Sequence, residues 1–326
     1  MRTLEMFDLF PFWNGVLSDL GFDVVLSSER AKLRGAALGT IPSESACFPS
    51  KIVHAHALDL VNRQVAAIFA PSVREIMPGE LSCPSLRGYP FVLKANVEEI
   101  SAGGVPLAAP VLERLFFSED YDVCSDVATR LLDALLPIAP DLSLSDVEHA
   151  LSVGSAAQRT FRDDVARMGK TALAAIKQRG GRGIVLAGRP YHGDPEIGHG
   201  IAGLLRECGF AVLSEDMLLF AEGSIEVQES KLSGWFYPDR VLSAARATTA
   251  FDKIEFMELY SFGCGLDALT VDCARDIIED SGKVFTALKI DEMVDLASIR
   301  IRVRSMIAAH ERRSFEKRGL PEDDGK

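Results

Sequence analysis

Short hydrophobic runs alternate with segments of helical spacing through the second half of the chain. The runs at 184–187, 210–213, 254–260 and 284–290 predict buried strands. Between and after them, apolar spacing predicts helices over 197–208, 235–249 and 298–313, and from Leu266 to a stop at Gly282. This alternation favours a parallel sheet.

In the first half of the chain the pattern of apolar and polar positions is less regular. Helices are expected over 4–20, 52–64, 121–136 and 142–178, and strands over 22–26, 65–71 and 105–110, with a turn-rich segment at 72–90. Pro11 implies a helix start or a kink. Because a doubly wound fold normally opens on a strand and this chain opens on a helix, the opening strand is expected to be missing.

These patterns predict an α/β fold of two domains. We expect a first domain at 1–140, a helical connection at 141–180, a second domain from the Gly-rich hinge at 181 to 314, and a disordered charged tail at 315–326. No short repeat is visible.

The net charge and the hydropathy of the chain argue against several classes of function. The net charge is −12 and the pI about 5.1, which gives nucleic-acid or anionic-membrane binding no electrostatic support. No apolar run reaches the roughly 20 residues that span a bilayer. The acidic N-terminus does not resemble a signal peptide, and six dispersed cysteines do not resemble a disulfide scaffold, so a reducing cytoplasm is expected.

Cys264 lies where the predicted strand at 254–260 turns into a helix that Asp267 can cap. Gly263 and Gly265 flank it and allow the close approach of a bulky ligand. Binding crevices of open α/β sheets lie at the carboxyl ends of strands, and helix N-termini stabilise thiolates. The sequence therefore predicts chemistry at Cys264.

Two further cysteines share this setting. Cys47 precedes a helix whose first turn holds Pro49, and Cys83 is followed directly by Pro84. The other three, Cys124, Cys208 and Cys273, fall in or at the end of predicted helices, where thiols usually pack as small hydrophobes. Zinc-type CxxC spacing is absent, whereas iron–sulfur clusters accept thiolates from separate loops. Inert turn cysteines are the alternative.

Several motifs occur in order along nearly the whole chain, from Arg2 to about Ala309. They are PSESACFPSK with VHAH at 42–56, CP with GYP at 83–90, GRPYH at 188–192, SFGCGLD at 261–267 and KIDE at 289–292. Together they resemble the 2-hydroxyacyl-CoA dehydratase-related and acyl-CoA dehydratase activase-related iron–sulfur proteins, which include the double-cubane cluster proteins.

The resemblance implies tandem flavodoxin-like, that is Rossmann-like, domains. It implies that Cys47, Cys83 and Cys264, with Gly263 and Gly265, hold a [4Fe–4S] cluster or half of a double-cubane [8Fe–9S] cluster shared in a homodimer. It also implies a separate or fused ATP-hydrolysing activase as partner, and an acyl-CoA or small-molecule substrate. No ATPase domain is present in this sequence, and the chain resembles the activase-associated module more than the dehydratase subunits.

Several other residues have more than one possible role. Arg189, Tyr191 and His192 follow a strand end, where they would meet an anionic substrate group or donate a proton, or else staple the loop. His54 and His56 do not share a helix face, so we expect one near Cys47 and one exposed. A basic stripe at Arg300, Arg302 and Arg304 would pair with acids at 291, 292 and 295 or dock an acidic partner.

Three functions follow. The leading one is an iron–sulfur protein, reduced by an ATP-dependent activator, that carries out low-potential reduction or radical dehydration of a small or CoA-linked substrate. The second is a non-catalytic module that docks an activase and relays electrons or regulates it. The third is a metal-free metabolite binder on the same fold.

Overall fold

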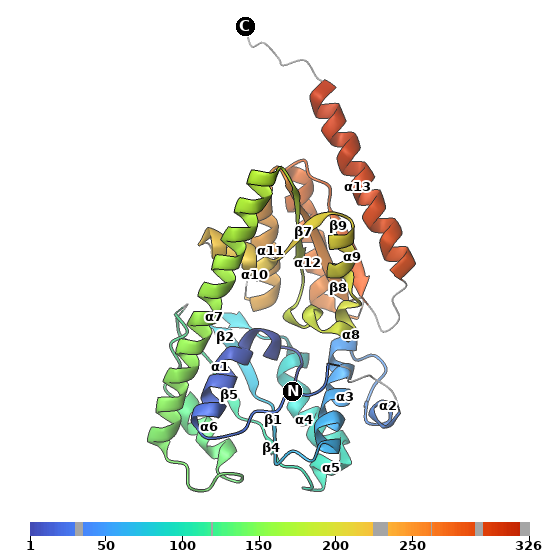
Figure 1. Cartoon of the computed structure of the whole chain (residues 1–326). Coiled ribbons are helices and arrows are strands. Elements are labelled where there is room, and N and C mark those ends of the chain that lie inside the picture. The colour runs from blue at the N-terminus through green and yellow to red at the C-terminus, as the bar shows by residue number, and fades with distance from the viewer. Residues whose placement is uncertain (30–34, 119, 224–233, 262, 291–295, 320–326) are drawn as a thin grey trace.

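The computed structural model describes residues 1–29, 35–118, 120–223, 234–261, 263–290 and 296–319. Two lobes lie one above the other in Figure 1, and the long helix α7 (Leu144–Arg179) runs along both. It packs against α1 (Met6–Asp19) in the N-terminal lobe and against α10 (Glu215–Glu222) in the C-terminal lobe. The predicted helical connection is therefore one continuous helix, with a Ser143–Asp146 capping box at its start and left-handed Gly180 at its end.

The C-terminal lobe contains a parallel sheet. Its strands are β6 (Arg182–Ala187), β7 (Phe210–Ser214), β8 (Ile254–Ser261) and β9 (Thr286–Ile290), in the order β7-β6-β8-β9. The first strand in sequence lies inside the sheet, and the order reverses between β6 and β8. That reversal defines a topological switch point, where doubly wound folds bind ligands at the carboxyl ends of the strands.

Helices cover this sheet. The loop after β6 contains η1 (Pro190–Gly193), and α8 (Pro195–Gly198) and α9 (Ile201–Glu207) follow it. The helices α10, α11 (Phe236–Thr249) and α12 (Gly265–Asp280) pack in series, whereas α13 (Leu296–Gly319) contacts α9 and extends beyond the lobe (Figure 1). Buried side chains of β6, β8, α11 and α12, such as Val185, Phe256, Leu242 and Ile278, form an apolar core.

The described residues of the N-terminal lobe form two small sheets, one of two strands and one of three. β1 (Ile68–Phe69) pairs parallel with β4 (Leu107–Ala108), and β2 (Ser72–Met77) pairs parallel with β5 (Val111–Arg114) and antiparallel with β3 (Glu80–Leu81). Pro71 and Pro110 separate the two parallel pairs. Proline has no N–H to donate, so each interrupts what would otherwise be one longer ladder.

Among the described residues of the N-terminal lobe, the helices besides α1 and α7 are α2 (Ala36–Gly39), α3 (Phe48–Asn62), α4 (Pro84–Asn96), α5 (Glu98–Ser101) and α6 (Val127–Leu135). Phe12 and Trp13 of α1 are fully buried, and their rings meet edge to face with centroids 4.7 Å apart. Pro11 lies inside α1 without ending it. The α/β class is confirmed, with parallel pairing in both lobes.

Some predicted elements were wrong. Residues 22–26 form no strand, since within the described residues they pair with no partner. The segment 72–90 is not mainly turns but holds β2, β3 and the start of α4. The helix predicted at 197–208 is split by the left-handed residues His199 and Gly200. α10 was not predicted at all.

The ends of elements also differ from the expectation. The helix predicted at 121–136 begins only at Val127, and α13 continues past Arg313 to Gly319, into the segment predicted as a disordered tail. Residues 320–326 of that tail lie outside the described part of the chain, as do the acids at 291, 292 and 295. The predicted pairing of those acids with the arginine stripe therefore stays a prediction.

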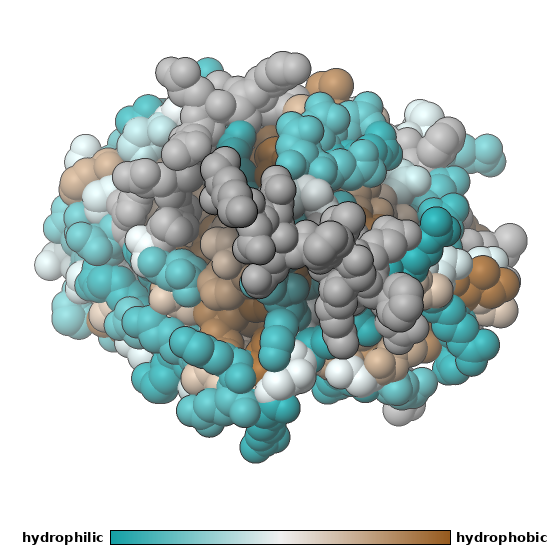
Figure 2. Space-filling model, turned by 90° about the horizontal axis from the view of Figure 1, so that it is seen from above, coloured by the Kyte–Doolittle hydropathy of each residue, from teal (hydrophilic) through white to brown (hydrophobic). Residues whose placement is uncertain are grey.

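Most of the face shown in Figure 2 is hydrophilic, with smaller hydrophobic areas between the charged side chains. Among the helices in the described ranges, none is both long enough and apolar enough to cross a membrane.

Candidate functional site

A cavity of about 460 Å³ lies at the carboxyl ends of β6 and β8, where the two lobes meet. The loop after β6 contributes Arg189 and Tyr191, and the loop after β8 contributes Cys264 with its flanking glycines. The N-terminal lobe contributes Cys47 and Cys83. The volume falls within the range of about 300–1,000 Å³ that is usual for ligand sites. The structure thus brings the three singled-out cysteines to one cavity.

Each of these cysteines is the N-cap residue of a helix. Cys47 precedes α3, Cys83 precedes α4 and Cys264 precedes α12. Pro49 and Pro84 stand in the first turns of α3 and α4, where a missing N–H costs nothing. Three helices therefore begin at the cavity, and their positive dipole ends favour bound anions and thiolates.

Cys264 accepts a hydrogen bond from the Asp267 backbone N–H, with the nitrogen 3.4 Å from Sγ. Burial and the nearby Asp267 carboxylate nevertheless raise the pKa of the Cys264 thiol to about 11. The isolated thiol is therefore neutral near pH 7. A bound cation would reverse this, because metal coordination deprotonates a thiol. Asp267, predicted as the cap of α12, lies one turn inside it, and Cys264 itself is the cap.

The loops that carry Cys47 and Cys264 touch. A Cβ at Gly263 would lie 3.8 Å from the Cys47 Cα, an ordinary van der Waals contact, so the two turns from different lobes are neighbours here. Cys47 Sγ lies 3.2 Å from Ser50 Oγ, whereas a Cβ at Gly265 would have no neighbour within 4 Å. All six cysteines are free thiols of intermediate exposure. Cys208 and Cys273 do not line the cavity, and Cys124 lines two other hollows in the N-terminal lobe.

A buried ion pair supports the Cys264 turn. Arg189 Nε lies 3.0 Å from Asp267 Oδ1, and the other carboxylate oxygen accepts the Ser261 N–H at 2.8 Å. Burial would lower the pKa of Arg189, but the facing Asp267 carboxylate raises it above its ordinary value. The pair ties the loop after β6 to the loop after β8 and places a permanent positive charge in the cavity wall.

His192 is placed differently from its neighbours. Arg189 N–H donates to His192 Nδ1 at 2.9 Å, and the imidazole does not line the cavity. Burial lowers the pKa of His192 to about 4, so the ring is neutral. A Cβ at Gly188 would lie 2.3 Å from His192 Nδ1, which makes glycine necessary for this packing. The geometry favours a role for His192 in holding the loop by a hydrogen bond over direct proton donation. Tyr191 lines the cavity, and burial raises the pKa of its hydroxyl.

The expectation for the two α3 histidines was wrong, because both are buried. His54 Nδ1 lies 2.8 Å from Thr40 Oγ1, and His56 Nδ1 lies 2.9 Å from Ser27 Oγ. His56 Nε2 also lies 3.5 Å from Asp194 Oδ2, which joins α3 to the C-terminal lobe. These histidines hold the loops around the site, and neither lines the cavity.

Sequence reasoning missed part of the cavity wall. Trp235, Tyr237 and Pro238 at the start of α11 line it, as do Leu4 and Leu81. The aromatic run at 235–237 just before a predicted helix was the available signal, but aromatic residues at a helix start indicate burial rather than a particular site. Most of this wall is apolar, which limits the access of water to the thiols.

The side chains around the cavity determine which metal or cluster they could hold. Across the described ranges, no three His, Cys, Asp or Glu side chains lie close enough together to hold a single metal ion. An iron–sulfur cluster makes a different demand, since its thiolates bind different irons from separate loops. Three thiols at three helix N-termini around one cavity, with a buried guanidinium in its wall, fit such a cluster.

The chain is similar to a known protein family. No curated protein matches the chain. A family model described as "CoA enzyme activase uncharacterised domain (DUF2229)" matches residues 1–218, which include the Cys47 and Cys83 turns and the Arg189 loop. The match covers 218 of the 326 residues, so the chain belongs to this family of CoA enzyme activase-related domains.

Proposed function

We propose that Cys47, Cys83 and Cys264 hold a [4Fe–4S] cluster, and that the protein uses it in low-potential electron chemistry driven by an ATP-dependent activase. The observation that carries this proposal is the meeting of three cysteine-capped helix N-termini at one cavity. Membership of the activase-related family supports the choice of partner.

Different residues around the cavity would have different roles in holding the cluster. The helix N-termini stabilise negative charge on the three sulfurs. Arg189 favours negative charge on the Cys264 sulfur and so offsets part of the opposite effect of its partner, the Asp267 carboxylate. Leu4, Leu81 and Trp235 exclude water. When bound, the cluster would supply one-electron transfer at low potential, and three thiolates would leave one iron available to a substrate oxygen or a bridging sulfide.

The test is iron and acid-labile sulfide per chain after strictly anaerobic purification, together with the absorption spectrum. We expect about four of each in the wild type and a sharp loss in Cys264→Ala. Cys273→Ala is the matched control, because it removes a cysteine of the same helix that lies outside the cavity. No iron in the wild type after reconstitution, or equal loss in both variants, would refute the proposed site.

Two measurements separate the cluster types and the roles. Light scattering of the iron-loaded protein should show a dimer if the cluster is a shared double cubane, and a monomer is expected if each chain holds its own. Titration with acyl-CoAs and small reducible ligands should perturb the cluster spectrum if the protein is a catalyst. An unaltered spectrum, combined with reduction by an activase and ATP, would identify a docking and relay module instead.

A further inference from the structure

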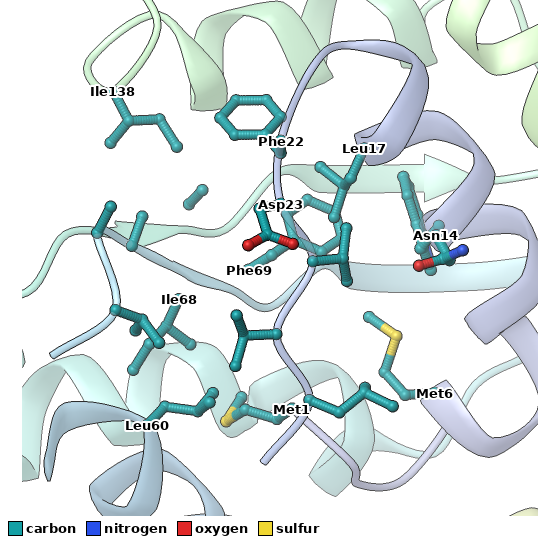
Figure 3. A pocket seen from close by; sticks show the side chains of 18 of the residues that line it. Met1, Met6, Asn14, Leu17, Phe22, Asp23, Leu60, Ile68, Phe69 and Ile138 are labelled. Carbon is teal, nitrogen blue, oxygen red and sulfur yellow. The ribbon is translucent and has the colours of Figure 1, made fainter. Parts of the chain in front are cut away.

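Two buried acids lie at the start of α1, away from the apolar cavity that this helix lines. Met6, Trp13 and Leu17 recur at helical spacing and line a cavity of about 370 Å³ in the N-terminal lobe (Figure 3). Glu5, the N-cap residue of α1, and Asp8 do not line that cavity. Both are nevertheless buried, so their partners lie elsewhere in the protein.

Glu5 lies directly behind the wall of the cysteine cavity. Its carboxylate accepts a hydrogen bond from the Ser82 hydroxyl. Leu4, the residue before Glu5, lines the cysteine cavity, and so do Leu81 and Cys83 on either side of Ser82. Consecutive Cα atoms are only about 3.8 Å apart. The hydrogen bond between Glu5 and Ser82 is therefore one residue away from the cavity wall along both segments.

The titratable groups that face Glu5 do not neutralise it. Asp8 follows it within the first turn of α1, Tyr89 comes from α4 and Tyr237 from α11, and each interacts electrostatically with Glu5. Both tyrosines are buried, and burial raises the pKa of each hydroxyl, so they are neutral near pH 7. Tyr237 also lines the cysteine cavity. None of these three groups supplies a positive charge.

Arg240 does not neutralise Glu5 either, because it already faces two other carboxyl groups. It pairs with Asp8 at 2.9 Å and with Glu215 at 3.1 Å. Among the described residues, no basic side chain pairs with Glu5. A buried carboxylate without a cation takes up a proton readily, and burial raises the pKa of Glu5 to about 7. Glu5 therefore exchanges its proton close to neutral pH.

The acids of α1 also have a connection to solvent. Asp8 and Arg240 line a separate cavity of about 240 Å³. Phe117, which lines it too, is 55% exposed, so this cavity reaches the protein surface. Asp8 thus meets a solvent-connected cavity, while Glu5 lies behind the wall of the cysteine cavity.

We propose that Glu5 takes up a proton when negative charge enters the cysteine cavity and releases it when that charge leaves. The inference rests on the proposed function for the source of the charge, which is one electron delivered by the activase. One proton from water converts the Glu5 carboxylate into the carboxylic acid, so electron and proton together add no net charge to the buried region. Because charges in a buried region are weakly screened, this compensation favours entry of the electron.

The first experiment tests the coupling in the iron-free full chain. Cys83→Asp places a negative charge in the cavity, and Cys83→Asn is the neutral control of the same size. NMR of the isotope-labelled Glu5 carboxyl carbon, assigned with Glu5→Gln, follows its protonation. We expect the Glu5 midpoint to lie at least about one pH unit higher in Cys83→Asp than in Cys83→Asn. Equal midpoints in the two variants would overturn the proposal.

The second experiment uses the iron-loaded protein, and it decides the question if Cys83→Asp does not fold. The midpoint potential of the wild type should fall as the pH rises from about 6 to 9, because reduction takes up a proton. Glu5→Gln keeps an oxygen for the Ser82 hydroxyl but does not titrate, so most of this pH dependence should disappear. Glu148→Gln, at an exposed position of α7, is the matched control and should retain it.

Two results of the second experiment would overturn the proposal. One is a potential of the wild type that does not change with pH, and the other is the same pH dependence in Glu5→Gln as in the wild type. A structural role of Glu5 alone would move stability but not this dependence. Absence of iron from the wild type would refute the proposed cluster instead, and the two Cys83 variants would then decide whether Glu5 responds to charge in the cavity.

Discussion

The Arg189 guanidinium and the Asp267 carboxylate form a buried ion pair that joins the loop after β6 to the helix that Cys264 caps. Both side chains are less than a tenth exposed. The pair therefore links two loops that are far apart in sequence at the point where they reach the cysteine cavity.

Asp267→Asn should destabilise the protein strongly. The amide keeps an oxygen for the Ser261 N–H but leaves the buried Arg189 charge without a counterion. Breaking one side of a buried ion pair typically costs about 3–5 kcal/mol. Urea unfolding with linear extrapolation measures the loss.

The matched control for Asp267→Asn is Asp272→Asn on the same helix. Asp272 pairs with Arg275 at 2.9 Å, but its side chain is 72% exposed. Solvent-exposed pairs contribute little, so we expect a change below about 1 kcal/mol. Similar losses in the two variants would contradict the structural role assigned to the buried pair.

Glu258 on β8 should make stability fall as pH rises. Burial, reinforced by the Asp267 carboxylate, raises the pKa of Glu258 from 4.5 to about 8. Between these two values the folded state holds a proton that the unfolded state has released, so the contribution present below pH 4.5 is lost by about pH 8. One such group gives a slope of about 1.4 kcal/mol per pH unit.

Glu258→Gln should reduce this slope, because the amide does not titrate. Unfolding free energies at pH 6, 7 and 8 check the prediction, with Glu148→Gln on the exposed face of α7 as the control. Glu5 and Glu215, whose pKa values burial raises to about 7, add slopes of the same sign that remain in both variants. An unchanged slope in Glu258→Gln would mean that Glu258 is ionised in the folded protein.

Local sequence signals were enough to predict the turns at Cys47 and Cys264, where Pro49 and the flanking glycines mark the start of a helix. At Cys83 they indicated an extended loop and missed the helix α4 that this cysteine caps. The Cys47 and Cys83 turns reach the same cavity through contacts between lobes, which motif spacing alone does not determine.

Features that depend on distant partners were not predicted. Residues 22–26 have the composition of a buried strand, but a strand requires a neighbour, and none is present in the described chain. The contact of Arg189 with Asp267 spans 78 positions, and no local pattern encodes it. β2 and β3 were missed because Pro78 and Gly79 between them read as a loop, whereas they form the turn of a short antiparallel pair.

His192 should remain neutral down to about pH 4, because burial lowers its pKa to that value. Its folded pKa lies below the ordinary 6.5, so the unfolded state binds the proton first, and this contribution to stability is lost as pH falls from about 6.5 to 4. Heteronuclear NMR of the imidazole, assigned with His192→Asn, should show no titration at pH 5–8. A midpoint near 6.5 would place the ring in water and contradict the conclusion that His192 is buried and holds the loop.

Gly188 and His192 should be energetically coupled. Gly188 does not have a left-handed backbone, so alanine is opposed there by the His192 ring rather than by its own φ angle. Gly188→Ala alone should cost about 1–3 kcal/mol through overpacking. His192→Ala alone should cost about 1–3 kcal/mol, because it leaves the buried backbone N–H of Arg189 without its acceptor.

In the double variant the new methyl group occupies space that the ring has left. The combined loss should therefore be smaller than the sum by at least about 0.5 kcal/mol in a double-mutant cycle measured by urea unfolding. Additive losses would show that the Gly188 methyl group meets some other obstacle, and that the ring does not set the requirement for glycine.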